Sequence, residues 1–336
     1  MPHWPDQPPY PPPGQQYYPT HPGSPIRPRW KPGIIALRPL SVSDIFNGAI
    51  TYVRANPRAT LGLTTGIVVA TALLPVLLVI VAPNISGDAP VVGDGLAGFA
   101  ATFLATILLS GMLTIVVARS VLGLTITSSQ TWKSFRGRLG ALFGLTVLES
   151  FAAAVLVGAA IGVVAGMDRV AGGVVAALIG ISLVLVLIIV FAFVFNLLSF
   201  APVAVVLERK PVMSAIRRSI ALVRNQFWRI MGVRVLATIV AVAVTVAVSV
   251  PFAVATLLIP SPGPNTVDLT IISAMLSALG QALGQIITIP FTAGVATLLY
   301  VDSRIRSEAF DFRLQSVLGE LSVGDRADTI WLTDNR

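Results

Sequence analysis

Glu149 is the residue whose type and position come closest to predicting chemistry in this chain. It is the one carboxylate deep inside a long apolar run, nine residues after that run begins at Gly140. This spacing places it about 14 Å along a helix, near the middle of a membrane. An ionisable group at that depth costs at least ~2.5–3.5 kcal/mol, so we expect Glu149 to face the protein interior. It is either part of a proton or substrate relay or a protonated, hydrogen-bonded packing residue beside Ser150.

Further polar side chains occur in two other apolar runs. Asn196 is a candidate polar partner for Glu149. In the last run, four polar residues recur at every fourth position and therefore share one face of a helix. This stripe consists of Ser273, Ser277, Gln281 and Gln285, and Gly280 and Gly284 beside it allow close helix approach. Hydrogen bonding between helices is one explanation of the stripe, and a hydrophilic substrate path is the other.

The sequence contains no residue set that predicts catalysis. There is no cysteine, which leaves no thiolate nucleophile, thiolate metal ligand or disulfide. The only histidines, His3 and His21, lie in a proline-rich N-terminal segment. The sequence has no phosphate-binding glycine loop, metal-ligand cluster or nucleophilic triad. We therefore expect no enzyme activity, no cofactor and no metal.

The elements that position these residues are predicted to be transmembrane helices. The chain is 55% hydrophobic and 11% charged, against about 25% charged in an ordinary soluble domain. Six apolar runs each exceed the ~20 residues that cross a bilayer. They span 59–82, 96–118, 140–166, 170–200, 231–259 and 270–301. We therefore expect an all-α, polytopic integral membrane protein.

The positions of the basic residues predict the orientation. Of 23 lysines and arginines, only Arg169 falls in a connection that the six-span pattern places outside the cell. Because basic residues concentrate on the cytoplasmic side, both termini are expected in the cytoplasm and the protein in the cell (cytoplasmic) membrane. The net charge of +8 then indicates anionic lipid headgroups as partners, and not nucleic acid.

Two tails are predicted to flank a membrane domain of residues 33–313. Residues 1–32 hold 12 of the 24 prolines, a composition that cannot build a core and is typical of disordered chain. This tail is either a docking segment for protein partners or a solvated spacer. Residues 314–336 are expected to form a second disordered, cytoplasmic tail.

A short basic segment precedes each odd-numbered span. In each of the three, an arginine is followed eight residues later by a glycine, as in Arg54–Gly62, Arg136–Gly144 and Arg224–Gly232. We interpret this as a threefold repeat of an amphipathic interfacial helix plus a helical hairpin, with chance similarity as the alternative. Ser41 and Asp44 predict a capping box at the start of the first interfacial helix.

The basic residues of these segments and of the last span's end either contact anionic lipid or anchor the topology. The candidates are Arg54, Arg58, Lys133, Arg136, Arg138, Arg217, Arg218, Arg224, Arg229, Arg304 and Arg306. Arg234 lies only about 5 Å into the fifth span, so we expect it to reach the interface as an anchor.

Three stretches carry a family resemblance. They are residues 37–49 (LRPLSVSDIFNGA), residues 298–311 (LLYVDSRIRSEAFD), and residues 202–208 (PVAVVLE) followed by Ala215–Ser219 and Phe227–Arg229. Together they resemble actinobacterial proline-rich multi-pass membrane proteins, which are similar to the membrane domain of some bacterial glycerophosphoryl diester phosphodiesterases. The resemblance implies a membrane module without the phosphodiesterase activity, because the catalytic Glu, Asp and His cluster of that family has no counterpart here.

Two functions follow as expectations. The first is a non-enzymatic scaffold or accessory factor that organises envelope or lipid components through the tail and the basic face. The alternative is a small-solute or lipid transporter with Glu149 and the Gln281/Gln285 stripe lining its path. An intramembrane enzyme is the least favoured class, because no nucleophile, acid and base converge in the sequence.

Overall fold

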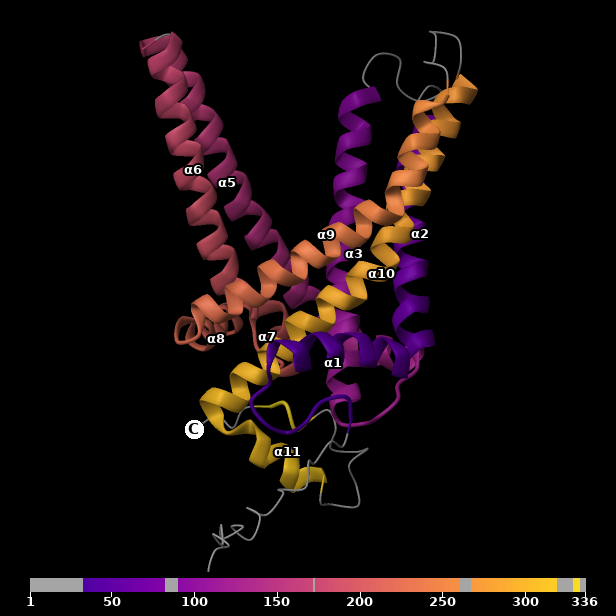
Figure 1. Cartoon of the computed structure of the whole chain (residues 1–336), viewed down its shortest axis with the longest axis vertical. Helices are drawn as coiled ribbons and strands as arrows, with labels where there is room; N and C mark the ends of the chain where they lie inside the picture. The colour runs from indigo at the N-terminus through magenta and orange to yellow at the C-terminus, as the bar shows by residue number, and fades with distance from the viewer. Residues whose placement is uncertain (1–32, 82–89, 172, 260–266, 319–328, 333–336) are drawn as a thin grey trace, which may run out of the picture. The chain divides into compact units, whose positions relative to one another are not determined.

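The computed structural model describes residues 33–81, 90–171, 173–259, 267–318 and 329–332, and the elements in these ranges are helical (Figure 1). The helices are α1 (Val42–Ala55), α2 (Pro57–Val81), α3 (Pro90–Val121), α4 (Ser128–Phe135), a 3-10 turn (Arg136–Arg138), α5 (Leu139–Ala171), α6 (Gly173–Leu198), α7 (Ala201–Leu207), α8 (Val212–Arg224), α9 (Phe227–Leu257), α10 (Val267–Glu308) and α11 (Phe310–Leu318). The all-α prediction is confirmed over these ranges.

Long apolar helices dominate the fold. Within the described side chains, five helical stretches are long and apolar enough to cross a membrane. They are Thr102–Val121, Ser128–Val163, Leu178–Leu207, Phe227–Leu257 and Ile271–Glu308. The remaining expected span, 59–82, coincides with α2, of which residues 74–81 are described by their backbone only.

Several helices extend beyond the apolar runs that predicted them. The third run was expected to end at residue 166, but α5 continues to Ala171. The last run was expected to end at 301, but α10 continues to Glu308 and is 42 residues long. Hydropathy marks where apolar side chains stop, whereas backbone hydrogen bonds carry a helix on through polar residues.

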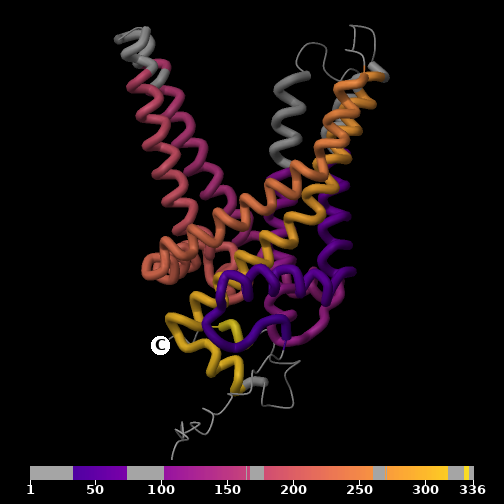
Figure 2. The backbone as a smooth tube through the Cα atoms, viewed as in Figure 1, coloured from indigo at the N-terminus to yellow at the C-terminus, as the bar shows by residue number. Residues whose placement is uncertain are grey.

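Helices α9 and α10 pack against one another along their length, and α10 also contacts α1, α2 and α3 (Figure 2). The predicted close approach at the two glycines of α10 is confirmed. A Cβ atom built on Gly284 would lie 2.9 Å from Thr245 Cγ2, and one on Gly280 would lie 2.9 Å from Phe252 Cβ. Without side chains there, the backbones of α9 and α10 come together. Helices α5 and α6 form a hairpin that contacts α3, α7, α8 and α9.

The first short helix begins where the sequence predicts. Ser41 caps α1, and its hydroxyl accepts from the backbone of Asp44 while the Asp44 carboxylate accepts from the backbone of Ser41, so the capping box is confirmed. The order short, long, long occurs three times, as α1–α2–α3, α4–α5–α6 and α8–α9–α10. This order agrees with the predicted repeat, and the equivalence of the three copies in space stays a prediction.

The disorder expected for residues 314–336 is not found in 314–318 and 329–332, the parts of this segment that the structure describes, and its cytoplasmic location stays a prediction. Helix α11 runs to Leu318, and Trp331 is only 2% exposed. The Trp331 ring packs on Phe310 with 5.4 Å between centroids, and its carbonyl accepts from Arg304 Nη1 at 3.0 Å. Composition alone does not show that Trp331 packs against the apolar Phe310 and the charged Arg304.

Candidate functional site

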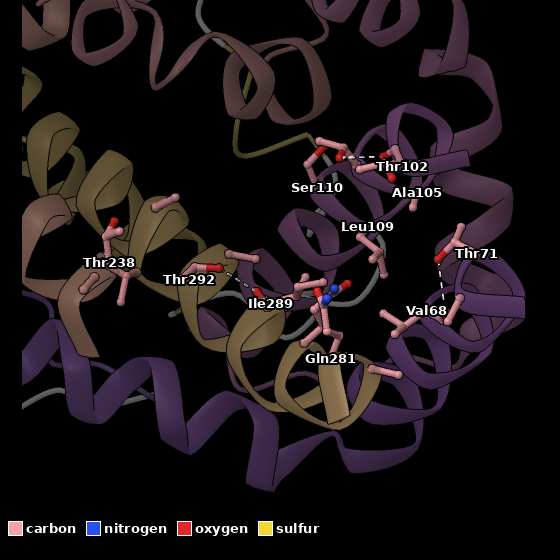
Figure 3. A pocket seen from close by; sticks show the side chains of 18 of the residues that line it. Val68, Thr71, Thr102, Ala105, Leu109, Ser110, Thr238, Gln281, Ile289 and Thr292 are labelled. Carbon is pink, nitrogen blue, oxygen red and sulfur yellow. Dashed lines mark hydrogen bonds between the residues drawn. The ribbon is translucent and has the colours of Figure 1, made fainter. Parts of the chain in front are cut away.

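A pocket of about 750 Å³ lies between α2, α3, α9 and α10 (Figure 3). Aliphatic and small residues form most of its walls, including Val68, Leu109 and Ile289. The polar groups on its walls are Arg234 of α9, Gln281 and Gln285 of α10, and several hydroxyls. The volume falls within the range of pockets that hold small organic ligands.

Most hydroxyls of the pocket are already engaged within their own helices. Thr71 donates to the carbonyl of Ile67 at 3.0 Å, Thr106 to that of Thr102 at 2.8 Å, and Thr292 to that of Thr288 at 3.0 Å. By contrast, the described residues provide no hydrogen-bond partner for the amides of Gln281 and Gln285. Figure 3 shows Gln281 extending into the space between the helices. These two amides are therefore the polar groups best able to meet a ligand.

The structure divides the polar stripe that the sequence predicted. Gln281 and Gln285 line the pocket, and Ser273 and Ser277 are outside its lining. Glu149 is also outside the lining, so this pocket does not bring it together with the two glutamines. Helix α5, which carries Glu149, supplies none of the pocket's residues.

Arg234 takes a position that sequence reasoning did not anticipate. Its guanidinium lies 5.0 Å from the centroid of the Phe195 ring, and its Nη1 donates to the Phe195 carbonyl at 3.4 Å. It lines the pocket and interacts electrostatically with Glu149. The Asn196 side chain, proposed as a partner of Glu149, instead donates to the Phe227 carbonyl at 3.4 Å. Among the residues that line the pocket, Arg234 is therefore the one through which the charge of Glu149 reaches it.

A second polar centre surrounds Asp302 near the end of α10. The fully buried Asp302 carboxylate accepts from the backbone of Leu40 at 2.7 Å, from Arg306 Nε at 3.0 Å and from Arg229 Nη1. Arg229 and Arg306 also donate to the Leu40 carbonyl, at 2.7 and 2.9 Å. These bonds join the segment before α1 to α9 and α10.

A neighbouring group surrounds the buried carboxylate of Glu208. It accepts from the Tyr300 hydroxyl and from Arg218 Nε at 3.0 Å, with Lys210 Nζ at 3.2 Å and Arg304 Nη1 at 3.7 Å. Burial acts to raise the pKa of Glu208, but the Tyr300 hydrogen bond and the charges of Arg304 and Arg218 outweigh it. The pKa of Glu208 is therefore held below its usual value.

The interactions around Asp302 and Glu208 show which predicted lipid contacts are buried or paired. Arg304 is 1% exposed and pairs with Glu208 and Glu308, so its prediction as a headgroup contact is wrong. Arg218 and Arg229 are half-buried, Arg306 is exposed, and all three are paired with carboxylates. Arg138 is half-buried. The exposed candidates without a described carboxylate partner are Arg54, Arg58, Lys133, Arg136, Arg217 and Arg224.

Sequence reasoning missed both buried carboxylates as organising residues. Leu40 and Asp302 are 262 positions apart, and Tyr300 and Glu208 are 92 apart, so no local pattern connects them. One signal was present: Leu40, Glu208 and Asp302 each lie in one of the three stretches that carry the family resemblance.

The long apolar helices and the pocket among them define a helical membrane protein. Residues 40–303 match the family model of a domain of unknown function, DUF7847, and the chain belongs to that family. The match extends from Leu40 to Ser303 and therefore covers the pocket and Asp302. No curated protein and no solved structure matches the chain. The resemblance to phosphodiesterase membrane domains stays a prediction.

Proposed function

We propose that this chain is a six-span protein of the cytoplasmic membrane that binds and moves a small amphipathic, lipid-like molecule through the pocket between α2, α3, α9 and α10. The observation that carries the proposal is the pocket itself, with two amides that lack described partners and one guanidinium on walls that are mostly apolar. Of the two functions expected from sequence, this geometry favours the transporter.

The lining argues for a ligand that is mostly apolar with an anionic or hydrogen-bonding group. Apolar walls favour hydrocarbon, because burying apolar surface is favourable by about 25 cal/mol per Å². Gln281 and Gln285 offer both donors and acceptors, and Arg234 offers a positive charge. A single-chain anionic amphiphile meets all three conditions.

The proposed orientation places α1, α4 and α8 at the cytoplasmic surface. Each of these helices is short, carries at least one basic residue in its last turn and precedes a long apolar helix, with the 3-10 turn between α4 and α5. Together with α2 as the sixth span, this puts both termini in the cytoplasm, in agreement with the distribution of arginines.

Binding is tested with a pocket-filling variant and its neighbour. Ala278 lines the pocket, whereas Leu279 is 52% exposed and outside its lining. We expect Ala278→Phe to weaken binding of a fluorescent lysophosphatidylglycerol to the full chain by about tenfold or more, and Leu279→Phe to leave it within about twofold. Equal affinities in the two variants would remove the pocket from the proposal.

Access is tested separately, because the chain contains no cysteine and a single one can be introduced cleanly. A cysteine at position 278 should react with a water-soluble thiol reagent in reconstituted vesicles, and lysophosphatidylglycerol should slow that reaction. Movement across the bilayer is then measured as flux of the same probe into vesicles, with Ala278→Phe as the blocked control. Binding without flux would reduce the proposal from a transporter to a lipid-binding protein.

The scaffold function depends on residues 1–32, which lie outside the described residues. It stays a prediction, checked by whether deletion of those residues changes the proteins recovered with the chain from native membranes.

A further inference from the structure

A second cavity, of about 970 Å³, lies where the chain passes from α8 to α9. Its walls come from residues 224–229, from Phe193 of α6, from Pro39 before α1, and from Ile305 and Arg306 of α10. It shares no residue with the pocket that we propose for transport. Three arginines line it, and they define its electrostatic character.

Positive charge exceeds negative charge in this cavity. Arg229 and Arg306 share the single carboxylate of Asp302, and the described residues provide no ion-pair partner for the exposed Arg224. Three guanidinium groups against one carboxylate leave an excess of two positive charges. Guanidinium groups match phosphate oxygens through paired hydrogen bonds, so a phosphate ester is the ligand that the excess charge favours.

Two of the three guanidinium groups are held in place before any ligand arrives. Arg229 and Arg306 are oriented by bonds to the Asp302 carboxylate and the Leu40 carbonyl. Preorganised donors bind more tightly than flexible ones, because less side-chain entropy is lost on binding. The network around Asp302 therefore prepares the cavity as well as stabilising the fold.

Aromatic residues beside the arginines indicate a lipid source for the phosphate. Trp228 is 76% exposed and packs edge-on against Phe227 at 5.4 Å, and Phe227 packs on Phe193 at 4.9 Å. Exposed tryptophan next to the start of a long apolar helix is typical of the headgroup layer of a membrane. The cavity thus combines cationic groups with an apolar side that acyl chains can contact.

The cavity also has an amide side chain in its lining. Gln226 lines it, and its Oε1 atom is buried without a hydrogen-bond partner among the described residues. Buried acceptors normally have a partner. A glycerol headgroup carries a phosphate and hydroxyls together, so it can meet both the arginines and the Gln226 amide.

We infer that this cavity binds the phosphate headgroup of an anionic membrane phospholipid, with phosphatidylglycerol as the headgroup that best fits its groups. Arg224, Arg229 and Arg306 hold the phosphate, and Trp228 and Phe193 lie beside the acyl chains. The inference rests on residues outside the transport pocket, so it stands or falls independently of the proposed function.

The test is native mass spectrometry of the full chain in detergent, titrated with phosphatidylglycerol and, as a reference, phosphatidylcholine. The diagnostic variant is Arg224→Gln, because Arg224 is exposed and has no described partner. Its matched control is Arg217→Gln, which removes the same charge from an exposed position of α8 outside the cavity. We expect Arg224→Gln to weaken phosphatidylglycerol binding about tenfold and Arg217→Gln to leave it within about twofold.

Equal weakening by the two variants would overturn the inference, because it would show a diffuse charge effect instead of a site. Equal binding of phosphatidylglycerol and phosphatidylcholine by the natural chain would also overturn it.

Inorganic phosphate and Trp228→Ala distinguish a lipid headgroup from free phosphate as the ligand. If Trp228→Ala weakens lipid binding and millimolar phosphate does not displace the lipid, the lipid assignment is supported; displacement by phosphate with no effect of Trp228→Ala would overturn it.

Discussion

Replacing Asp302 with asparagine tests whether the buried ion-pair network holds the ends of the membrane helices together. The substitution keeps the size of the side chain and removes its charge. The carboxylate is fully buried and accepts from Arg229, Arg306 and the Leu40 backbone. After substitution, two guanidinium groups remain beside it with no counter-charge.

The magnitude follows from the burial of the partners. Breaking a buried ion pair by removing one member typically costs 3–5 kcal/mol. Here the side chains of Arg229 and Arg306 are 29% and 33% exposed, so water compensates part of the loss. We therefore expect Asp302→Asn to lower the free energy of unfolding by about 2–3 kcal/mol.

The assay is reversible unfolding in mixed micelles with increasing dodecyl sulfate, followed by circular dichroism. Asp311→Asn is the control, because Asp311 is half-buried at the start of α11 and has no ion pair among the described residues; it should lose less than about 1 kcal/mol. A double-mutant cycle with Arg306→Gln should show losses smaller than additive. Equal losses for Asp302→Asn and Asp311→Asn, or full additivity in the cycle, would refute the reasoning.

Three further predictions concern stability. The pKa of Glu208 is lower in the fold than its ordinary value of 4.5. Its contribution to the free energy of unfolding is therefore complete above about pH 4.5 and is lost as the pH falls below that value. Glu208→Gln should flatten this part of the curve of stability against pH, and an unchanged curve would show that Glu208 does not contribute. A Cβ atom at Gly294 would lie 2.5 Å from Tyr52 Cε1, so Gly294→Ala should lower the free energy of unfolding by about 1–3 kcal/mol in the same assay. A variant as stable as the natural chain would contradict the close packing of α1 on α10. Trp331→Ala should cost about 3–5 kcal/mol, because the ring is buried on Phe310; a loss below about 1 kcal/mol in thermal unfolding would contradict that docking.

The periodic and compositional features of the fold were predictable because their causes are local. A run of more than twenty apolar residues must form a helix in lipid, since every backbone group needs a partner within the segment. The capping box at Ser41 and Asp44 involves residues three positions apart, and it forms as expected. Helix ends were less predictable, because the backbone of α10 continues through charged residues to Glu308.

The candidate site was only partly predictable. The four-residue spacing indicated that Gln281 and Gln285 share a helix face, and the structure places both in the pocket. The same spacing includes Ser273 and Ser277, which lie outside the pocket because the other walls are set by α2, α3 and α9. Glu149 stood out by its depth in a span, yet its helix supplies no part of the pocket wall.

The sequence by itself therefore determines an all-helical chain built for an apolar solvent, because hydropathy and capping act between residues that are close along the chain. Only the tertiary structure decides which polar groups meet. Asp302 is paired with Arg229 and Leu40 across 73 and 262 positions. Arg304 is buried, although its position just after the last apolar run predicts a surface arginine. Such pairings depend on how the helices pack, and packing depends on shape complementarity among side chains that composition and period do not encode.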